Sequence, residues 1–352
     1  FKNTPNYIDK IIGRGKKFNI QNIDINSEYS DFGSIIKDKK IYFTSSRNTD
    51  RKSYGWNDEP FLDIYSSTIN EKGSFLEPNL LEDLNSKFHE GILSFSADGN
   101  TIYFTRESFY EKEFEKSEEN KNKYGQSYIY KATKLKDKFN IIESLDINDP
   151  SFSNKNPMVS PDGKHLYFSS NRPGGFGMYD IYRADINDDG TLSDVENLGQ
   201  NVNSEGQEGF PFLSNDNVLY FSSDGHLGIG GLDVFYSRYI DGKWSNVRNV
   251  GIPVNSGADD FAFIIDEENE NGFVSSNRPG GIGKDDIYAL KKIKPICDIL
   301  LESTIVDSKT NNPIETALTS ISDGTGVIEN TKESNPDGLV AYILECGDEF
   351  NL

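Results

Sequence analysis

An aromatic pair, or its equivalent, followed by serine or threonine recurs along this chain, and its regular spacing restricts the fold more than any other feature. The second residue of each copy stands at positions 43, 104, 168, 221 and 274, which gives steps of 61, 64, 53 and 53 residues. Units of about fifty residues are typical of β-propeller blades, each built from four strands. The spacing therefore predicts a five-bladed β-propeller, with repeat copies at Tyr42–Arg47, Tyr103–Arg106, Tyr167–Gly175, Tyr220–Ser223 and Phe273–Gly281.

Each unit shows the same order of turn and strand signals. Asp-Gly pairs such as Asp98-Gly99 and Asp162-Gly163 supply the backbone conformation of a tight hairpin before the aromatic strand. A third strand follows a loop that is often rich in glycine, and it begins at Asp63, Tyr128, Asp180, Asp233 or Asp286. This pattern favours an all-β protein.

The two ends of the repeat region predict how the ring closes. The fifth unit stops after its third strand, because Lys294-Pro295 begins a different pattern. Residues 18–26 resemble residues 139–148, the fourth strand of unit two, so we expect residues 18–26 to complete blade five and remove an open sheet edge. The propeller then covers residues 18–294, and residues 1–17 belong to a linker or to the tail of an upstream domain.

Residues 295–352 change character and predict a second domain. Short alternating strands separated by turn signals favour a small β-sandwich, which we expect to be incomplete. Cys297 and Cys346 are the two cysteines of the chain, and both lie in this region. They form a disulfide in an oxidising compartment or remain two buried thiols, and the sequence leaves both possibilities open.

The formal net charge of −21 restricts the partners. It repels nucleic acid and anionic lipid surfaces, and it keeps a secreted or periplasmic protein soluble. No stretch of the sequence approaches the length of an apolar membrane span, so we expect neither nucleic acid binding nor a direct membrane span.

One segment matches the pattern of a calcium-binding loop, D-x-[DN]-x-[DN]-G-x5-E. The oxygen ligands of this predicted calcium site are Asp185, Asn187, Asp189, the carbonyl of Thr191, and Glu196. The alternative is an ordinary hairpin between the third and fourth strands. Unit one has Lys72 in the place of Asp189, so the hairpin itself does not require a metal ion. No other cofactor is expected.

Arginine and aspartate recur at the two ends of one loop. We expect each arginine to hold the aspartate of its own loop by an ion pair, although a ring of arginines that captures an anionic ligand is an alternative. The pairs are Arg47 with Asp63, Arg172 with Asp180, and Arg278 with Asp286.

Catalysis has little support in the sequence. His89, His165 and His226 are isolated, and no Gly-x-Ser-x-Gly motif or metal-binding cluster of histidine and cysteine is present. We therefore expect a protein that is not an enzyme. Five-bladed propellers include glycoside hydrolases that use paired carboxylates, so a glycosidase is the remaining enzymatic alternative.

Two families share motifs with this chain. The run Ser160–Gly175 followed by Asp180-Ile181-Tyr182 resembles TolB-like, WD-type propeller repeats, which are common in periplasmic and outer-membrane-associated proteins of Gram-negative bacteria. Units two and four depart from that pattern at Tyr128 and Asp224. The second domain resembles the carboxypeptidase regulatory-like domain, which is a non-catalytic spacer.

Together the two domains resemble PorE-like, OmpA-family proteins of the type IX secretion system. The resemblance implies a periplasmic location associated with the outer membrane, and peptidoglycan binding only through a further C-terminal domain. We therefore expect a non-catalytic scaffold that binds envelope or secretion-system proteins. The alternative is a glycan- or peptide-binding module that uses the central channel or aromatic residues such as Tyr54 and Trp56. The charged insertion at residues 106–127 is either a solvated loop or a docking element.

Overall fold

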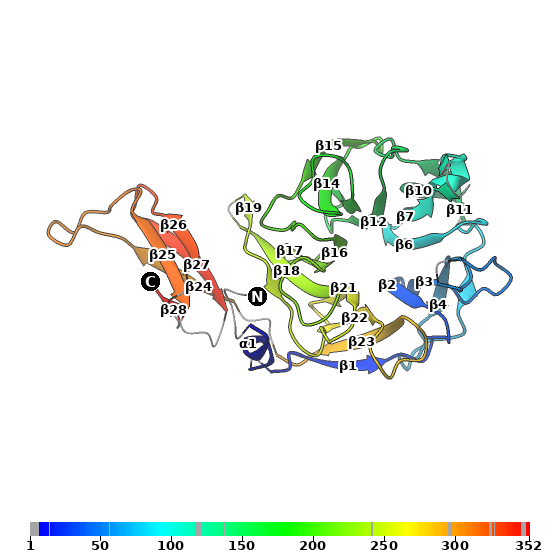
Figure 1. Cartoon of the computed structure of the whole chain (residues 1–352), viewed down its shortest axis with the longest axis horizontal. Helices are drawn as coiled ribbons and strands as arrows, with labels where there is room; N and C mark the ends of the chain where they lie inside the picture. Colours follow the sequence, from blue (N-terminus) through cyan, green and yellow to red (C-terminus); the bar gives the residue numbers. More distant parts are fainter. Residues whose placement is uncertain are drawn as a thin grey trace. The chain divides into compact units, whose positions relative to one another are not determined.

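A computed structural model of the chain forms two compact units, residues 1–293 and 294–352 (Figure 1). It describes residues 7–13, 15–55, 57–116, 122–136, 138–240, 242–294, 298–323, 326, 328–345 and 350–352. Strands dominate both units, and the described helices are α1 (Tyr7–Gly13) and the short 3-10 helix η1 (Ser108–Glu111). No helix in these ranges is long and apolar enough to cross a membrane.

The strands of the first unit form a series of antiparallel sheets, which we call blades 1 to 5 in chain order. Blade 1 contains β2 (Asp31–Lys37), β3 (Lys40–Ser45), β4 (Asp63–Thr68) and β5 (Asn79–Leu80). Blade 2 contains β6 (Glu90–Phe95), β7 (Thr101–Glu107), β10 (Ser127–Leu135) and β11 (Lys138–Ser144). Blade 3 contains β12 (Asn154–Val159), β13 (His165–Ser170), β14 (Asp180–Ile186) and β15 (Leu192–Asn197).

The last two blades follow the same order of strands. Blade 4 contains β16 (Glu208–Leu213), β17 (Val218–Ser223) and β18 (Asp233–Ile240), and β18 pairs with both β19 (Lys243–Trp244) and β20 (Arg248–Asn249). Blade 5 contains β21 (Asp260–Asp266), β22 (Asn271–Ser276), β23 (Asp286–Lys292) and β1 (Phe18–Asn22). Outside the blades, β8 (Glu115–Lys116) and β9 (Lys123–Tyr124) pair with each other.

The first strands of the blades surround a central channel. Among the described elements, β2 contacts β6, β6 contacts β12, β12 contacts β16, β16 contacts β21, and β21 contacts β2. This closed series of innermost strands defines a β-propeller (Figure 1). The predicted fold class, an all-β chain with a β-propeller, is confirmed. The pairing of β1 with β23 joins the N-terminal segment to the last blade.

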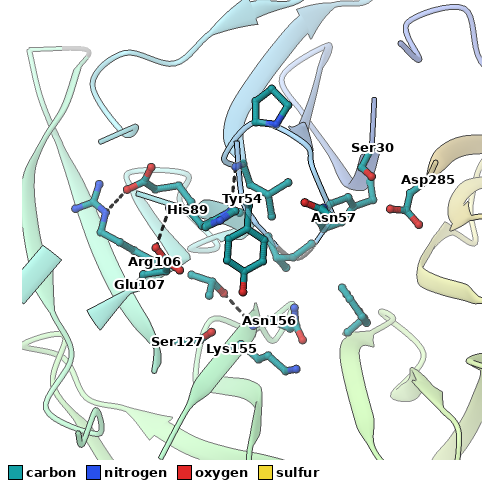
Figure 2. A pocket seen from close by; sticks show the side chains of 18 residues that line it. Ser30, Tyr54, Asn57, His89, Arg106, Glu107, Ser127, Lys155, Asn156 and Asp285 are labelled. Carbon is teal, nitrogen blue, oxygen red and sulfur yellow. Dashed lines mark hydrogen bonds and ion pairs between the residues drawn. The ribbon is translucent and has the colours of Figure 1, made fainter. Parts of the chain in front are cut away.

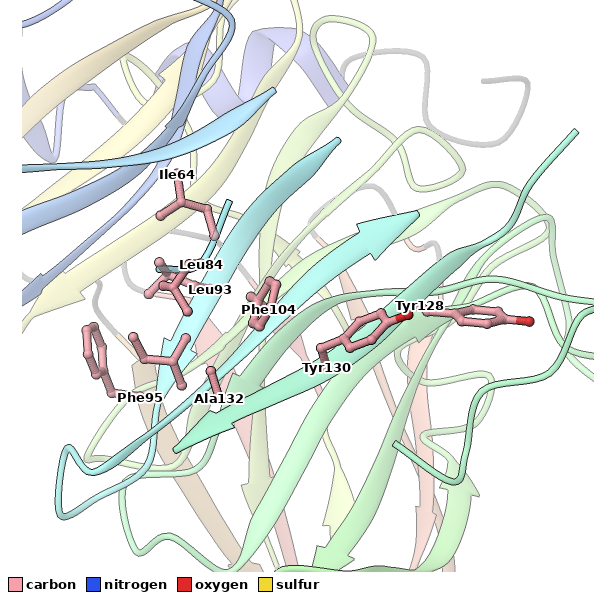
Figure 3. Packing of buried hydrophobic residues seen from close by; sticks show 9 residues of the cluster. Ile64, Leu84, Leu93, Phe95, Phe104, Tyr128, Tyr130 and Ala132 are labelled. Atoms are coloured by element: carbon pink, nitrogen blue, oxygen red, sulfur yellow. The ribbon is translucent and has the colours of Figure 1, made fainter. Parts of the chain in front are cut away.

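The blades pack face to face, so their middle strands are buried on both sides. On β7, Ile102, Tyr103 and Phe104 are all almost completely buried. Figure 3 shows the cluster in which Ile64 and Leu84 of blade 1 meet Phe104 and other residues of blade 2. Full burial of such a side chain stabilises the fold by about 1.5 to 3 kcal/mol. The aromatic residue of the repeat is therefore part of the core between neighbouring blades.

Every innermost strand carries a bulge at the same place, where the pairing register shifts. The residue at each bulge has a positive φ, and these residues are Gly33, Ile92, Asn156, Phe210 and Ala262. Three of the bulge N–H groups donate to a hydroxyl on the preceding blade. For example, the N–H of Asn156 donates to Thr105 Oγ1 at 3.0 Å. This contact explains why Thr or Ser follows the aromatic residue in the repeat.

An asparagine holds the third strand of every blade. In blade 1, Asn85 Oδ1 accepts from the N–H of Ile64, and Asn85 Nδ2 donates to its carbonyl. The same pair of hydrogen bonds is made by Asn148, Asn203 and Asn255. In blade 5 the asparagine is Asn26, from the N-terminal segment, and its partner is Ile287. Each blade is thus tied to the segment that leads into the next one.

The second unit contains two sheets. One joins β24 (Asp298–Thr304) to β27 (Leu339–Glu345), and the other joins β25 (Leu318–Asp323) to β26 (Ile328–Glu333) and β28 (Phe350–Asn351). Ile321, Val340 and Tyr342 form the buried core that the two sheets share. Cys297 and Cys346 lie outside the described residues, so the disulfide stays a prediction.

The substitution Asn26→Ala tests how much the ring depends on its closure. It leaves a buried N–H and a buried carbonyl of Ile287 without their side-chain partner, and we expect the free energy of unfolding to fall by about 2 to 4 kcal/mol. Denaturant unfolding of the first unit measures this change. Asn19→Ala is the matched control, because Asn19 is exposed on β1, and it is expected to change stability by less than about 0.5 kcal/mol. Equal effects of the two substitutions would contradict the closing role of Asn26.

Candidate functional site

The first residue of each innermost strand is buried at one end of the channel. These residues are Asp31, Glu90, Asn154, Glu208 and Asp260. In four blades a serine four residues earlier donates both its N–H and its hydroxyl to the acid, as Ser204 does to Glu208 at 2.9 and 2.5 Å. The buried carboxylates therefore hold the connections between blades in shape, and their hydrogen-bonding capacity is largely used.

The arginines of the repeat bind a different blade element from the one predicted. Arg47 pairs with Asp31 at 2.5 Å and Arg278 pairs with Asp260, so both reach the first strand of their own blade. Arg172 donates to Asn154, which occupies the same position in blade 3. The prediction that each arginine holds the aspartate of its own loop was wrong.

The physical reason lies in the ring beneath each guanidinium and in the loop amides. The guanidinium of Arg172 lies 5.2 Å from the ring centroid of Phe168, which directs it back toward the first strand. Asp180 instead accepts the N–H groups of Phe176 and Gly177, at 2.6 and 3.0 Å. Asp286 accepts equivalent amides of its own loop. Asp63 pairs with another arginine, Arg51, at 2.8 Å.

A double-mutant cycle distinguishes the two pairings. We expect Arg278→Ala and Asp260→Asn to show a coupling energy above about 1.5 kcal/mol in the free energy of unfolding, because both groups are buried or partly buried. Arg278→Ala and Asp286→Asn should couple by less than about 0.5 kcal/mol. A larger coupling with Asp286 would restore the original prediction. Urea unfolding of the four variants of each cycle measures both values.

The predicted calcium ligands lie on the hairpin between β14 and β15, where each acid has a protein partner. Asp185 Oδ1 is 2.8 Å from His165 Nδ1, and Glu196 pairs with Arg183 at 2.5 Å. Asp189 accepts from the N–H and hydroxyl of Thr191, at 3.0 and 2.6 Å. Asn187 also hydrogen-bonds the Thr191 hydroxyl. In the described parts of the chain no group of three His, Cys, Asp or Glu residues is arranged to hold a metal ion, and the calcium site stays a prediction.

A cavity of about 390 Å³ opens at the channel end that carries the starts of the first strands. All five blades contribute to its wall, blade 5 through Asp285 next to β23, and blade 1 also through the loop between β3 and β4 (Figure 2). Phe32, Ile92 and Phe210 make part of the wall apolar, and Tyr54 stands beside them. Its volume lies within the range of about 300 to 1,000 Å³ of small-molecule sites. This cavity, which we call the mouth pocket, is the candidate functional site.

His89 lines the mouth pocket in its neutral form. Its Nδ1 accepts the N–H of Leu62 at 3.0 Å, so the ring proton lies on Nε2. Burial lowers the pKa of His89 to about 4, and the ring stacks on Phe61 with a centroid distance of 4.2 Å. Nε2 is buried and has no hydrogen-bond partner among the described residues. His89 therefore presents one unused hydrogen-bond donor.

Lys155 breaks the repeat inside the channel. It follows Asn154 on β12, at the position that Phe32, Gly91, Gly209 and Phe261 occupy in the other blades. Its Nζ lies 3.7 Å from the ring centroid of Tyr179, and it has no ion pair or hydrogen bond within the described residues. Burial lowers the pKa of Lys155 to about 8, which leaves the ammonium protonated at neutral pH. The next residue, Asn156, has a buried Oδ1 that accepts no hydrogen bond from the part of the chain that the structure describes.

Two carboxyl groups complete the polar wall of the mouth pocket. Burial raises the pKa of Glu107 to about 7, and Glu107 Oε2 accepts a long hydrogen bond of 3.4 Å from the N–H of His89. Burial also raises the pKa of Asp285. Beside Glu107, Arg106 is fully buried and pairs with Glu90 at 2.7 Å, and its guanidinium lies 4.3 Å from the ring centroid of Tyr110. The pocket thus contains Lys155, a cation without an ion pair in the described chain, and two acids whose pKa values are raised by burial.

The charged insertion packs partly on blade 2. Tyr130 donates to Glu111 at 3.0 Å, and Tyr128 donates to Glu113 at 2.5 Å. Because Tyr128 replaces the aspartate that starts the third strand in the other blades, the glutamate of the insertion brings a carboxylate to the same end of the strand. Residues 117–121 lie outside the described ranges, so the choice between a solvated loop and a docking element stays open.

Only part of the mouth pocket is predictable from the sequence. Tyr54 was a candidate, and its companion Trp56 lies outside the described residues. In the sequence His89 is an isolated histidine, and no motif marks Lys155, Asn156 or Glu107 as part of a site. The sequence signal for Lys155 is that it stands at a position where the other units of the repeat have phenylalanine or glycine.

Comparisons with known proteins give distant structural similarities. No family model matches the chain, and no curated protein matches it. TolB from Acinetobacter baumannii is 19% identical, with 73% of this chain and 52% of that chain covered and a TM-score of 0.37. Endo-arabinase from Bacteroides thetaiotaomicron is 11% identical, with 78% and 96% covered and a TM-score of 0.48.

A third similar structure is prolyl oligopeptidase B from Galerina marginata, which is 12% identical, with 81% of this chain and 37% of that chain covered and a TM-score of 0.37. The chain therefore spans about half the length of TolB from Acinetobacter baumannii and less of the oligopeptidase. Since these similarities are weak, the propeller assignment depends on the closed series of innermost strands.

The raised pKa of Glu107 predicts a pH dependence of stability. The folded state binds more protons than the unfolded state between pH 4.5 and pH 7, so the free energy of unfolding falls as the pH rises through this window. Glu107→Gln removes this effect and keeps an acceptor for the N–H of His89. We expect the variant to exceed the wild type by about 1 to 3 kcal/mol at pH 7.5 and to match it near pH 4.5.

Denaturant unfolding at several pH values measures the difference. Glu205→Gln is the control, because Glu205 is exposed and its replacement should leave the pH profile unchanged. A constant difference between Glu107→Gln and the wild type over the whole pH range would contradict the assignment of the raised pKa to Glu107.

Proposed function

We propose that this protein is a non-catalytic, protein-binding propeller of the bacterial cell envelope. The observation that carries the proposal is a set of exposed apolar side chains on the loops between second and third strands. Tyr54, Phe176, Met178 and Ile282 are 41%, 42%, 64% and 56% exposed, and they come from three different blades. Antiparallel pairing brings these loops to the end of the propeller at which the first strands begin, and Tyr54 lines the mouth pocket there. Apolar groups gathered on one face favour a protein partner.

The carboxylates support a binding role over glycoside hydrolysis. A glycosidase needs two accessible carboxyl groups on either side of a glycosidic bond, about 5 to 9.5 Å apart. Asp31, Glu90, Glu208 and Asp260 instead accept from serine or arginine and are buried. Glu107 and Asp285 are the acids of the mouth pocket that accept fewer hydrogen bonds, and they belong to different blades.

The finer proposal concerns location and partners. The TolB-like repeat motifs favour the periplasm, and the resemblance to PorE-like, OmpA-family proteins favours association with the outer membrane and a scaffold role in type IX secretion. The second unit then serves as a carboxypeptidase regulatory-like spacer. Peptidoglycan binding, on this proposal, belongs to a further domain of the same family architecture.

A glycan- or peptide-binding module is the second candidate function. It is favoured by the mouth pocket itself, which combines aromatic and apolar walls with polar atoms that have no partner in the described structure. The two candidates are compatible, because a protein partner can insert a chain segment into the channel.

Cross-linking and co-purification from the native envelope in mild detergent test the proposed function. We expect recovery of outer-membrane or secretion components, linked to the loops between second and third strands. Replacing Phe176, Met178 and Ile282 by serine should reduce that recovery about tenfold or more, because apolar anchors dominate interface energy. Ile36→Ser with Leu135→Ser is the control at the opposite end of the blades, where both side chains are exposed.

Two results would overturn the proposal. One is recovery of the protein alone under conditions that preserve other envelope complexes. The other is an equal loss of partners in the control variant, which would move the binding surface away from the proposed face.

A further inference from the structure

The mouth pocket contains four polar atoms that have no hydrogen-bond or ion-pair partner in the described chain. Lys155 Nζ faces an aromatic ring and has no anionic partner in the described chain. Among the described residues, Asn156 Oδ1 is a buried acceptor without a donor, and His89 Nε2 and Arg106 Nη1 are buried donors without an acceptor. Buried polar groups are normally paired, and leaving one unpaired is unfavourable. A ligand that pairs Lys155, Asn156 and His89 would remove this cost at three of the four atoms.

We propose that the mouth pocket binds the C-terminal end of a peptide chain, with its carboxylate on Lys155 and its last side chain on the apolar wall. The inference rests on the proposed protein-binding function and names the part of the partner that enters the channel. It assigns a site and a ligand class to residues from blades 1 to 4.

The groups of a peptide end complement the unused groups of the pocket. Lys155 has no anionic partner in the described chain, and a carboxylate would bring one negative charge to its ammonium group. Charge-assisted hydrogen bonds of this kind are among the strongest in proteins. The last peptide N–H fits the acceptor Asn156 Oδ1, and a peptide carbonyl fits the donor His89 Nε2. Ile92, Phe32 and Phe210 provide the apolar surface for a bulky terminal side chain.

The other charges of the pocket argue for one negative charge rather than two. Glu107 and Asp285 line the same cavity, and the charge of the remaining cation, Arg106, is offset by its ion pair with Glu90, although Arg106 Nη1 has no partner among the described residues. A phosphate dianion would meet these acids with one free cation in the described lining. Like charges at close range repel, so a monocarboxylate is favoured over a phosphate.

The small number of unused groups argues for a peptide rather than a sugar acid. A sugar acid also has a carboxylate, but its several hydroxyl groups need donors and acceptors along the whole wall. Phenylalanine, isoleucine and leucine form an apolar part of the described lining. Polar neighbours such as Glu90, Thr105 and Asn57 already make hydrogen bonds within the chain. Burying hydroxyl groups against that wall would leave them unpaired, which is unfavourable.

The first experiment compares two probes on the unmodified protein. N-acetyl-Gly-Phe with a free carboxylate and N-acetyl-Gly-Phe amide differ only at the C-terminal group, and galacturonate serves as the sugar-acid probe. Titration calorimetry or NMR titration at pH 7 measures all three. We expect the free acid to bind about tenfold or more tightly than the amide and than galacturonate.

The second experiment assigns the charge to Lys155. Lys155→Met removes the ammonium and keeps an apolar side chain, and it should weaken binding of the free-acid probe about tenfold or more while leaving the amide unchanged. Lys164→Met is the matched control, because Lys164 is exposed on the hairpin between β12 and β13 and carries the same charge. Thermal unfolding of each variant confirms that the fold is retained.

Three results would overturn the inference. Equal affinity of the unmodified protein for acid and amide would remove the carboxylate from recognition, and this comparison does not depend on any variant. Tighter binding of galacturonate would make the pocket a sugar-acid site. Unchanged binding of the free acid to Lys155→Met would place the charge recognition elsewhere. If envelope partners are still recovered alongside any of these results, the proposed function stands and only the peptide-end site is overturned. Cleavage of the bound probe would instead overturn the non-catalytic function, while the assignment of the binding site would stand.

Discussion

The pairing of β1 with β23 is the interaction on which the rest of the propeller depends. Without it blade 5 would present an open edge, and the N-terminal segment would not be joined to the last blade by strand pairing. Asn26 extends the same closure by binding both backbone groups of Ile287. The N–H of Asp31 then donates to the carbonyl of Asp285 at 2.8 Å, so strand pairing, side chain and loop all join the two ends of the ring.

The architecture was predictable because a repeat imposes the same local chemistry in each unit. Aromatic residues at equal spacing mark the strands buried between blades, and Thr or Ser after them marks the contact with the next bulge. A second repeated signal is an Asn-Ser pair followed by an acid, as in Asn203-Ser204 and Glu208. It also marks the repeat and did not enter the prediction of the fold. The arginine partners were not predictable from spacing, because the first strand competes with the loop for the guanidinium and the loop amides already satisfy the aspartate.

The mouth pocket was far less predictable than the fold. His89, Lys155 and Phe210 are far apart in the sequence and meet only because the innermost strands converge on one axis. None of them belongs to a motif, and a histidine or lysine ordinarily points to solvent. Lys155 differs from the residues at the same position in the other units. Only a comparison among the units of the chain could therefore have predicted its role.

The bulge on every innermost strand has a consequence for how such a protein diversifies. It places two successive side chains near the channel while its own N–H can bind the neighbouring blade. In three blades the hydrogen bond of the bulge N–H secures these places, so side chains such as those of Ile92 and Lys155 are not needed to hold the ring closed. These two positions can therefore change one at a time, and ligand preference can drift through evolution while the architecture persists.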